Sequence, residues 1–120
     1  MAVFDLEDLM TTFAQDICHF LKLIPSTEAN KIYSHQLLRS SSSVGANYLE
    51  ANDALGKKDF LVKIRTARRE GKETRYWLRL LQIADNRELE HKRATLIDET
   101  EQLIRILSTI IHKVEVRTTF

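Results

Sequence analysis

The chain has 120 residues with 43% hydrophobic and 29% charged residues, and its formal net charge is +1. These values predict one soluble domain with a modest core, and the single cysteine excludes an intrachain disulfide and favours the reducing cytoplasm. No apolar run approaches the ~20 residues of a membrane span, and acids occupy the N-terminus where a signal peptide would carry basic residues.

The first predicted helix spans residues 4–24. Its apolar residues recur at spacings of three and four, as expected for one buried helix face: Leu6, Leu9, Met10, Phe13, Ile17, Phe20, Leu21 and Ile24. Asp5, Glu7 and Asp8 fall in the first turn, where the helix dipole favours acids, and Pro25 stops the helix. Cys18 lies just beside this face without a cluster of bases or metal ligands, so we expect an unreactive thiol.

The second predicted helix spans residues 27–53 and begins at an N-cap formed by Ser26 or Thr27. Its centre reads RSSSSVGAN. A flexible linker is disfavoured because the apolar period continues in phase on both sides. A phosphate-binding loop would need more glycines and a lysine, and a serine nucleophile would need a triad context that the sequence lacks. We therefore expect the small residues to allow close approach of a neighbouring helix.

The third predicted helix spans residues 57–84 and follows a short turn at Gly56. Its seam consists of residues at helical spacing: Phe60, Ile64, Ala67, Gly71, Thr74, Leu78 and Leu81. Gly71 lies on this seam, so close helix contact is the favoured interpretation and a hinge is the alternative. Tyr76 and Trp77 either stack on nucleic-acid bases or form a half-buried contact with the core or a subunit.

A row of basic side chains lies about a third of a turn from this seam, at about 100° per residue. We call it the basic stripe: Arg65, Arg68, Lys72, Arg75 and Arg79. Between Lys57 and Arg79 the chain carries nine Lys or Arg and three acids, a local charge of +6 that leaves −5 for the rest. The candidate nucleic-acid-binding residues are the stripe together with Lys57, Lys58, Lys63 and Arg69.

The fourth predicted helix spans residues 88–114, capped by Asp85 or Asn86. Its apolar residues form two adjacent rows, which predicts burial against more than one neighbour: Leu89, Leu96, Thr100, Leu103, Leu107, Ile110 and Val114, then Ile97, Ile104 and Ile111. Four helices with short connections predict an all-α fold, an antiparallel up-down-up-down four-helix bundle that forms a single domain over residues 1–120.

The sequence makes no case for an enzyme, a cofactor or a metal. The four histidines are scattered at His19, His35, His91 and His112, and none forms the Glu-x-x-His pattern of di-iron bundles. A metal site assembled from different helices is the disfavoured alternative. The acidic run Asp98-Glu99-Thr100-Glu101 is interpreted as a solvated face or as the partner of a basic surface on another subunit.

Several segments together resemble one known family. The stretch from Gln36 to Ala51, QLLRSSSSVGANYLEA, resembles the second-helix signature of the 23S rRNA intervening-sequence proteins, also called S23-like four-helix-bundle proteins. The resemblance continues through KKDFL (57–61), KIRTA (63–67), Glu70, ET (73–74) and YWL (76–78). The chain departs from the pattern at Ala51, where many members have Gly, so we expect the second helix to continue a little further before it turns.

The resemblance implies a four-helix bundle that assembles as a homopentameric ring. It also implies kinship with the accessory variability protein of diversity-generating retroelements, a basic pentamer that binds nucleic acid and a reverse transcriptase. The ribosomal-protein label attached to the family does not imply a component of the ribosome. By analogy, the expected partners are further copies of the chain, structured RNA or DNA, and a protein such as a reverse transcriptase, without a membrane.

Two functions remain open on the sequence. In the first, the basic stripe binds phosphates and a pentamer repeats it around a ring, so that avidity strengthens weak single contacts. In the second, the protein is an assembly module. Its stripe then pairs with Asp98, Glu99 and Glu101 of a neighbouring subunit, or with Glu70 and Glu73 in its own helix. A solvated charged face without either role is the third interpretation.

Overall fold

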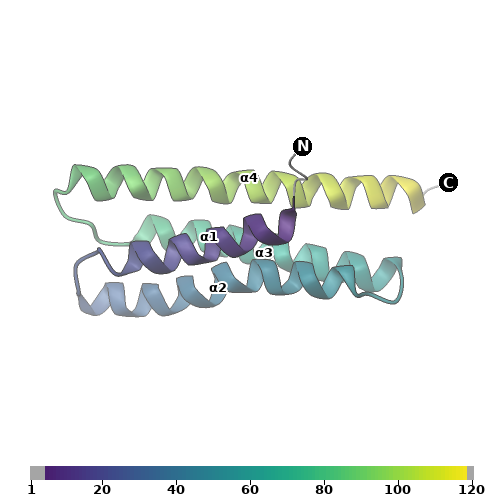
Figure 1. Ribbon diagram of the computed structural model, residues 1–120, viewed down its shortest axis with the longest axis horizontal. Coiled ribbons are helices and arrows are strands. Elements are labelled where there is room, and N and C mark those ends of the chain that lie inside the picture. Colours follow the sequence, from purple (N-terminus) through teal and green to yellow (C-terminus); the bar gives the residue numbers. More distant parts are fainter. Residues whose placement is uncertain (1–4, 119–120) are drawn as a thin grey trace.

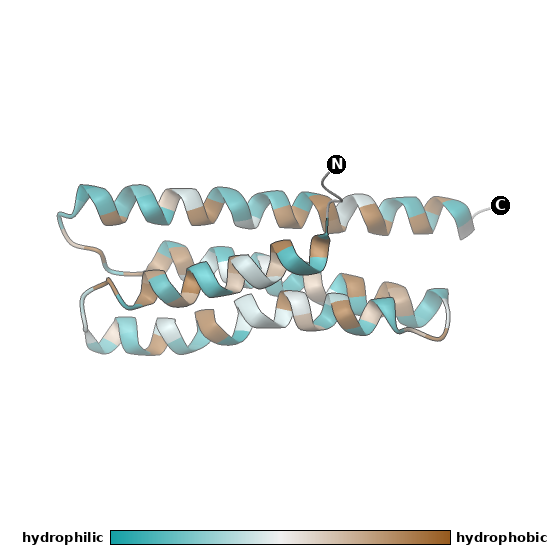
Figure 2. Ribbon diagram, viewed as in Figure 1, coloured by the Kyte–Doolittle hydropathy of each residue, from teal (hydrophilic) through white to brown (hydrophobic). Residues whose placement is uncertain are grey.

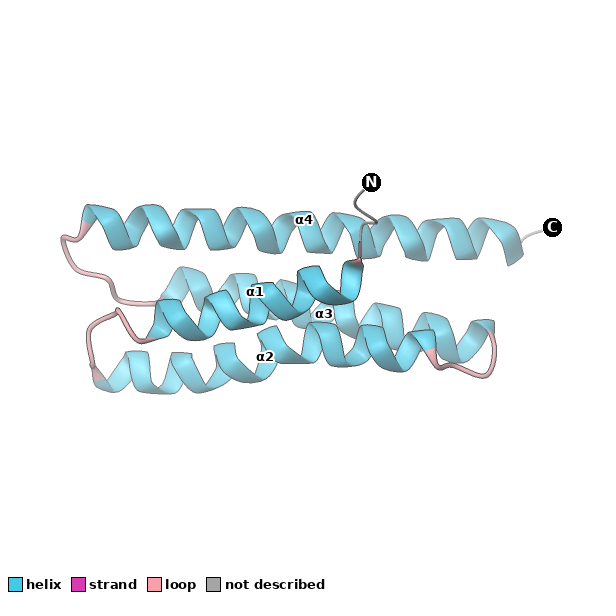
Figure 3. Ribbon diagram, viewed as in Figure 1, coloured by secondary structure: helices cyan, strands magenta, loops and turns pink. Residues whose placement is uncertain are grey.

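The computed structural model describes residues 5–118, which form four α-helices joined by short loops (Figures 1 and 3). The helices are α1 (Leu6–Leu21), α2 (Glu28–Asn52), α3 (Lys57–Leu80) and α4 (Arg87–Thr118). The predicted all-α fold is confirmed. The serine-rich centre of α2 is continuous helix, as the uninterrupted apolar period predicted.

The helices alternate in direction, and each packs against its sequence neighbours, with α1 closing the ring against α4 (Figure 1). The bundle measures 54 × 34 × 20 Å. The α1–α2 and α3–α4 loops lie at one end, and the α2–α3 turn lies at the other (Figure 1). Because α1 has 16 residues and α4 has 32, α1 covers only part of α4.

The core runs along the bundle axis and contains most of the apolar residues predicted from helical spacing (Figure 2). Leu9 is the exception on α1, because it was predicted on the buried face but is 39% exposed. Ile17, Leu37, Ile64, Leu78 and Leu107 are fully buried. Small residues allow the closest approaches. A Cβ at Gly71 would lie 3.2 Å from Cγ1 of Ile104, so the close-contact interpretation of Gly71 is confirmed. A Cβ at Gly45 would lie 3.4 Å from Cβ of Met10.

Side-chain caps begin three of the helices. Asp5 accepts hydrogen bonds from the amides of Glu7 and Asp8, so it precedes α1 rather than lying in its first turn. Thr27 accepts from the Asn30 amide at 3.0 Å, and Asn86 accepts from the Leu89 amide at 3.0 Å. Each cap satisfies amides that have no partner inside the helix.

The helix ends differ from the predicted bounds by a few residues. The predicted start at residue 4 lies outside the described residues. Helix α1 ends at Leu21, before Pro25, because a tight turn follows in which the Lys22 amide donates to the His19 carbonyl. Helix α2 ends at Asn52, one residue beyond the unusual Ala51.

Helix α3 ends at Leu80 rather than residue 84, because the backbone of Leu81 is extended at φ −56° and ψ 137°. Ala84 has a positive φ of 60°. Leu81 and Ile83 are nevertheless buried, so this loop also contributes apolar side chains to the core without helical backbone. Helix α4 begins at Arg87 and extends to Thr118, beyond the predicted residue 114.

Two polar side chains fix the loop end of the bundle. The Asn30 amide nitrogen donates to the carbonyls of Pro25 and Gln82 at 2.9 and 2.8 Å, and its oxygen accepts from the Gln82 amide at 2.8 Å. Arg93 donates to the Leu81 carbonyl at 2.6 Å. Asn30 therefore connects the α1–α2 loop to the α3–α4 loop.

Within residues 5–118, none of the helices is both long enough and apolar enough to cross a lipid bilayer.

Candidate nucleic-acid interface

The basic stripe lies on the side of α3 that adjoins α4. Two of its five members are held by α4. Arg65 forms an ion pair with Glu115, and Arg68 donates to the hydroxyl of Ser108 at 3.3 Å. These contacts fix the stripe next to α4 and partly neutralise its N-terminal half.

The other three members of the stripe are unpaired. Lys72, Arg75 and Arg79 form no ion pair or side-chain hydrogen bond with any residue in the described range 5–118. Lys72 and Arg79 are exposed, and Arg75 is half-buried. These three residues leave a local positive charge over two turns of α3 that the rest of the described chain does not neutralise.

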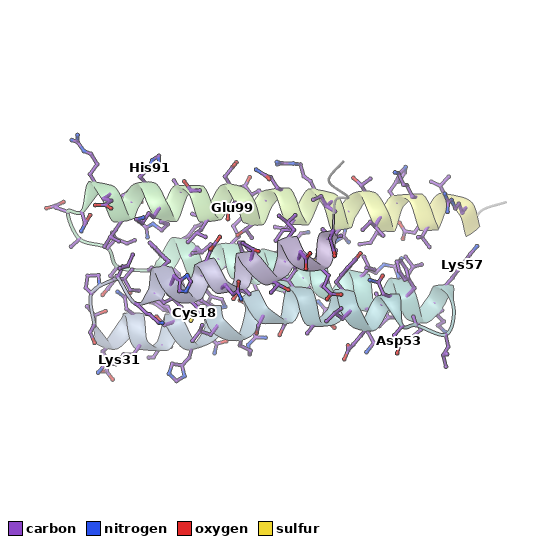
Figure 4. All side chains as sticks on the ribbon, viewed as in Figure 1. Cys18, Lys31, Asp53, Lys57, His91 and Glu99 are labelled. Carbon is purple, nitrogen blue, oxygen red and sulfur yellow. The ribbon has the colours of Figure 1, made fainter. Side chains whose placement is uncertain are left out.

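The remaining candidate cations are distributed around α3. Lys63 lies on the opposite side and pairs with Glu50 of α2 at 3.3 Å. Lys57 and Lys58 are exposed at the start of the helix, and Figure 4 shows Lys57 at the α2–α3 turn. Arg69 is exposed and has no ion pair within residues 5–118. The structure therefore separates Lys63 from the other candidates.

The predicted pairing of the stripe with acids of its own helix is wrong. Glu70 and Glu73 point towards α2, where both accept hydrogen bonds from Arg39, with 2.8 Å to Glu70. Arg39 also donates to Gln36 at 3.2 Å. Burial lowers the pKa of Arg39, but the hydrogen bonds and charges of the two glutamates outweigh this effect and raise it. Glu70 and Glu73 are thus neutralised on the side of α3 away from the stripe.

Tyr76 and Trp77 have different environments. Trp77 is half-buried, its ring stacks on Tyr33 of α2 with centroids 6.0 Å apart, and its Nε1 donates to Glu73 at 3.2 Å. Tyr76 is 55% exposed and meets the Trp77 ring edge-on, with centroids 5.2 Å apart. The half-buried interpretation therefore fits Trp77, whereas the ring of Tyr76 remains open to solvent.

A second charged surface lies in the groove between α1 and α4. Asp16, Asp98 and Glu99 line this groove, which has a volume of about 300 Å³. Figure 4 shows Glu99 on the side of α4 that faces α1. Burial, together with the charges of Asp16 and Asp98, raises the pKa of Glu99. The sequence indicated the acids of α4 but not Asp16, which lies more than eighty positions away.

The interpretation of this acidic run as a solvated face is only partly right. Thr100 is fully buried and bonds the Leu96 carbonyl at 2.7 Å, whereas Glu99 and Glu101 are half-buried and Asp98 is exposed. The run crosses from the surface into the core because consecutive residues on a helix point in different directions.

Metal binding and serine catalysis find little support in the described residues. No group of three or more His, Cys, Asp or Glu in residues 5–118 is placed to share a metal ion. His19 and His91 line a neighbouring pocket between α1 and α4 that shares Asp16 and Glu99 with the acidic groove, but each histidine is exposed (Figure 4 labels His91). Ser40 bonds Thr74 in the core at 2.8 Å, and Ser42 bonds the backbone of its own helix. The serine run therefore has a packing role.

The comparisons with known proteins agree with this fold. The family model described as 23S rRNA-intervening sequence protein matches residues 6–109. A solved structure from Bacteroides thetaiotaomicron VPI-5482 is 31% identical, with a TM-score of 0.76. The alignment covers 89% of this chain and 98% of that chain, which is described as a protein with unknown function from the S23 ribosomal protein family. No curated protein matches the chain. The chain therefore belongs to the family of 23S rRNA-intervening sequence proteins.

Proposed function

We propose that this protein is a non-enzymatic, oligomeric scaffold that binds structured RNA through the basic stripe. The observation that supports the proposal best is the absence of acidic partners for Lys72, Arg75 and Arg79 within residues 5–118. Three neighbouring cations without acids are suited to phosphate groups, whose contacts supply most of the affinity in nucleic-acid binding.

The placement of the acids of α3 adds to this argument. Glu70 and Glu73 are held by Arg39 at the α2–α3 contact, so they lie away from the unpaired cations. The near-neutral total charge of +1 therefore does not describe this surface. Phosphate contacts would position the nucleic acid without reading its sequence.

The proposed target and assembly follow from the family. Its description refers to intervening sequences of 23S rRNA, which favours structured RNA over duplex DNA as the ligand. We propose a homopentamer by the same kinship, in which the stripe would occur five times and avidity would increase the affinity of each weak contact.

The test compares two triple variants that remove the same amount of charge. Lys72→Gln/Arg75→Gln/Arg79→Gln removes the unpaired cations of the stripe. Lys22→Gln/Lys31→Gln/Lys92→Gln removes three exposed lysines elsewhere and is the control. Affinity for a structured RNA and a matched duplex DNA is measured by fluorescence anisotropy across a salt series, with the mass of each protein determined by light scattering.

We expect the stripe variant to bind RNA far more weakly while it keeps its mass and its helicity. On duplex DNA, the slope of log affinity against log salt should fall by about 0.9 for each phosphate that the variant no longer neutralises. The control variant should bind nearly as tightly as the wild type. Equal weakening in both variants, or no binding by the wild type at low salt, would contradict the proposal.

Protein assembly is the second candidate, and the acidic α1–α4 groove favours it. Asp16, Asp98 and Glu99 form a surface whose charge is opposite to that of the stripe and that could receive the stripe of another copy. In that case the stripe variant should show a smaller mass in light scattering, whatever its effect on RNA. Asp16→Asn/Asp98→Asn should then cause the same dissociation.

A further inference from the structure

An aromatic ring stands beside the unpaired cations on the outer surface of α3. Tyr76 is 55% exposed, although large aromatic side chains usually bury most of their surface. It lies four residues after Lys72 and three residues before Arg79, so all three share one face of the helix. The ring is therefore flanked along the helix by cations that have no acidic partner in the described chain.

The ring of Tyr76 is supported from below by a series of fixed contacts. It rests edge-on against Trp77, with centroids 5.2 Å apart, and Trp77 stacks on Tyr33 of α2. The indole Nε1 donates to Glu73 at 3.2 Å, and Glu73 also accepts from Arg39. These contacts restrict Trp77 and place the positive charge of Arg39 beside the Glu73 carboxylate, which reduces the repulsion of phosphate by that carboxylate.

We propose that Tyr76 stacks on an unpaired base of the nucleic acid bound along the basic stripe. This inference rests on the proposed function and specifies its ligand: RNA with single-stranded loops or bulges rather than continuous duplex. Bases in a duplex are stacked on one another and cannot cover a side chain, whereas unpaired bases stack on aromatic rings. The phosphates on either side of that base would contact Lys72 and Arg79.

The test uses two RNAs of the same length, one a hairpin with an unpaired loop and the other a blunt duplex. Tyr76→Ala removes the ring, Tyr76→Phe keeps it, and Tyr76→Leu keeps apolar volume without an aromatic face. Ile32→Ala is the control, because Ile32 is a similarly exposed apolar residue, 58% exposed on α2. Helicity and thermal midpoint are recorded for every variant.

We expect Tyr76→Ala and Tyr76→Leu to weaken hairpin binding by roughly fivefold to 150-fold, the effect of removing one stacking ring. Binding of the blunt duplex should be unchanged, and Tyr76→Phe and Ile32→Ala should resemble the wild type on both RNAs. Trp77 is the only tryptophan of the chain and touches Tyr76, so its fluorescence should change with the hairpin but not with the duplex.

The outcomes separate this inference from the proposed function. Equal affinity of Tyr76→Ala and wild type for the hairpin would overturn the stacking role and leave phosphate binding by the stripe intact. Equal weakening on hairpin and duplex would also overturn it, because the ring would then act without regard to base pairing. Absence of binding to either RNA by the wild type would overturn both proposals. A smaller oligomer mass in Tyr76→Ala with unchanged RNA affinity would assign the ring to a protein contact instead.

Discussion

Thr74 and Ser40 form a hydrogen bond between α2 and α3 inside the core, at 2.8 Å. Both residues are fully buried. Thr74→Val would retain the shape of the side chain but leave the Ser40 hydroxyl without this partner. We expect the free energy of unfolding to fall by about 1–2 kcal/mol, measured by urea denaturation.

Thr66→Val is the matched control for this prediction. The Thr74 hydroxyl also lies 2.8 Å from the Glu70 carbonyl, four residues earlier on α3, and Thr66 makes the equivalent contact with the Val62 carbonyl at 2.8 Å. Thr66 is only half-buried, however, and has no hydrogen-bond partner on another helix within the described residues. Its replacement should change the free energy of unfolding by less than about 0.5 kcal/mol. Equal effects at the two positions would show that the hydrogen bond with Ser40 contributes nothing.

Glu99 gives the fold a defined dependence on pH. Its pKa in the folded protein is raised by burial and by the charges of Asp16 and Asp98, so the fold favours the protonated carboxyl. The charged form therefore reduces stability at neutral pH, and this penalty disappears as the pH falls below the usual pKa of glutamate.

Glu99→Gln should consequently raise the thermal midpoint at neutral pH, and the gain should vanish below about pH 4. Thermal denaturation followed by circular dichroism across this pH range measures the difference. Glu101→Gln, at a half-buried position two residues along α4, is the control. A gain for Glu99→Gln that does not depend on pH would contradict the explanation.

At the level of single residues, the sequence predicts contacts that are local and misses those that are distant. The caps at Thr27 and Asn86 follow from residue type just before an apolar period. The bonds of Asn30 to Gln82 and of Arg39 to Glu70 join residues 52 and 31 positions apart. No spacing rule identifies such pairs, because the relative position of the helices decides them.

Gly45 of α2 and Gly71 of α3 both lie inside helices, but the neighbouring helix leaves different amounts of space for a side chain at each. Replacing a helical Gly with Ala gains up to about 1 kcal/mol in helix propensity. A Cβ at Gly45 would make an ordinary contact of 3.4 Å with Met10, whereas a Cβ at Gly71 would lie 3.2 Å from Ile104. We expect Gly45→Ala to raise the free energy of unfolding by about 0.5–1 kcal/mol and Gly71→Ala to raise it less or to lower it.

Urea denaturation of both variants, each alone and combined with Ile104→Ala, measures this difference. Ile104→Ala removes Cγ1, the atom that the new methyl group would meet at 3.2 Å, so it should improve the relative stability of Gly71→Ala. The same change should not affect Gly45→Ala, since Gly45 faces α1. Equal gains at both glycines would contradict the predicted difference in packing.

At the level of elements, apolar periodicity locates the helices but not their ends. The helical period of α3 continues through Leu81, which is buried, and Ile83 is buried two residues later, as the alternation of side chains along extended backbone allows. The helix nevertheless ends at Leu80, because extended residues that cross the end of the bundle also bury apolar side chains. Over three or four residues, the pattern of apolar residues alone does not distinguish helical from extended backbone.

The whole molecule is packed unevenly along its length. Helix α1 covers only part of α4, and Ile111 is the last buried residue of α4 in the described range. Residues 112–117 are exposed or half-buried. We expect hydrogen exchange to be fastest there and slowest near Leu96 and Leu107, because local opening costs least where it exposes little apolar surface. Mass-spectrometric exchange on peptides from α4 measures the gradient.

At the level of the whole molecule, the sequence predicted one positively charged side. It did not predict which cations of that side have no protein partner and so can bind phosphate. The stripe divides because α4 supplies Glu115 and Ser108 to its first two members and no acid to Lys72, Arg75 or Arg79. This division depends on the register between α3 and α4. The exposed ring of Tyr76 likewise depends on where Tyr33 of α2 meets Trp77.

The hydrogen bonds of Asn30 join the two helical hairpins at one end of the bundle, so the hairpins could associate as separate chains. Asn30 belongs to the first helical hairpin, and Gln82 follows the third helix in the second hairpin. The turn that joins the hairpins contains Leu55, which is fully exposed at 101%. A protein cut at this turn would consist of two fragments that share a core and a specific pair of hydrogen bonds at the opposite end. The bundle could therefore serve as a split reporter, in which reassembly of the two halves restores one register of the helices.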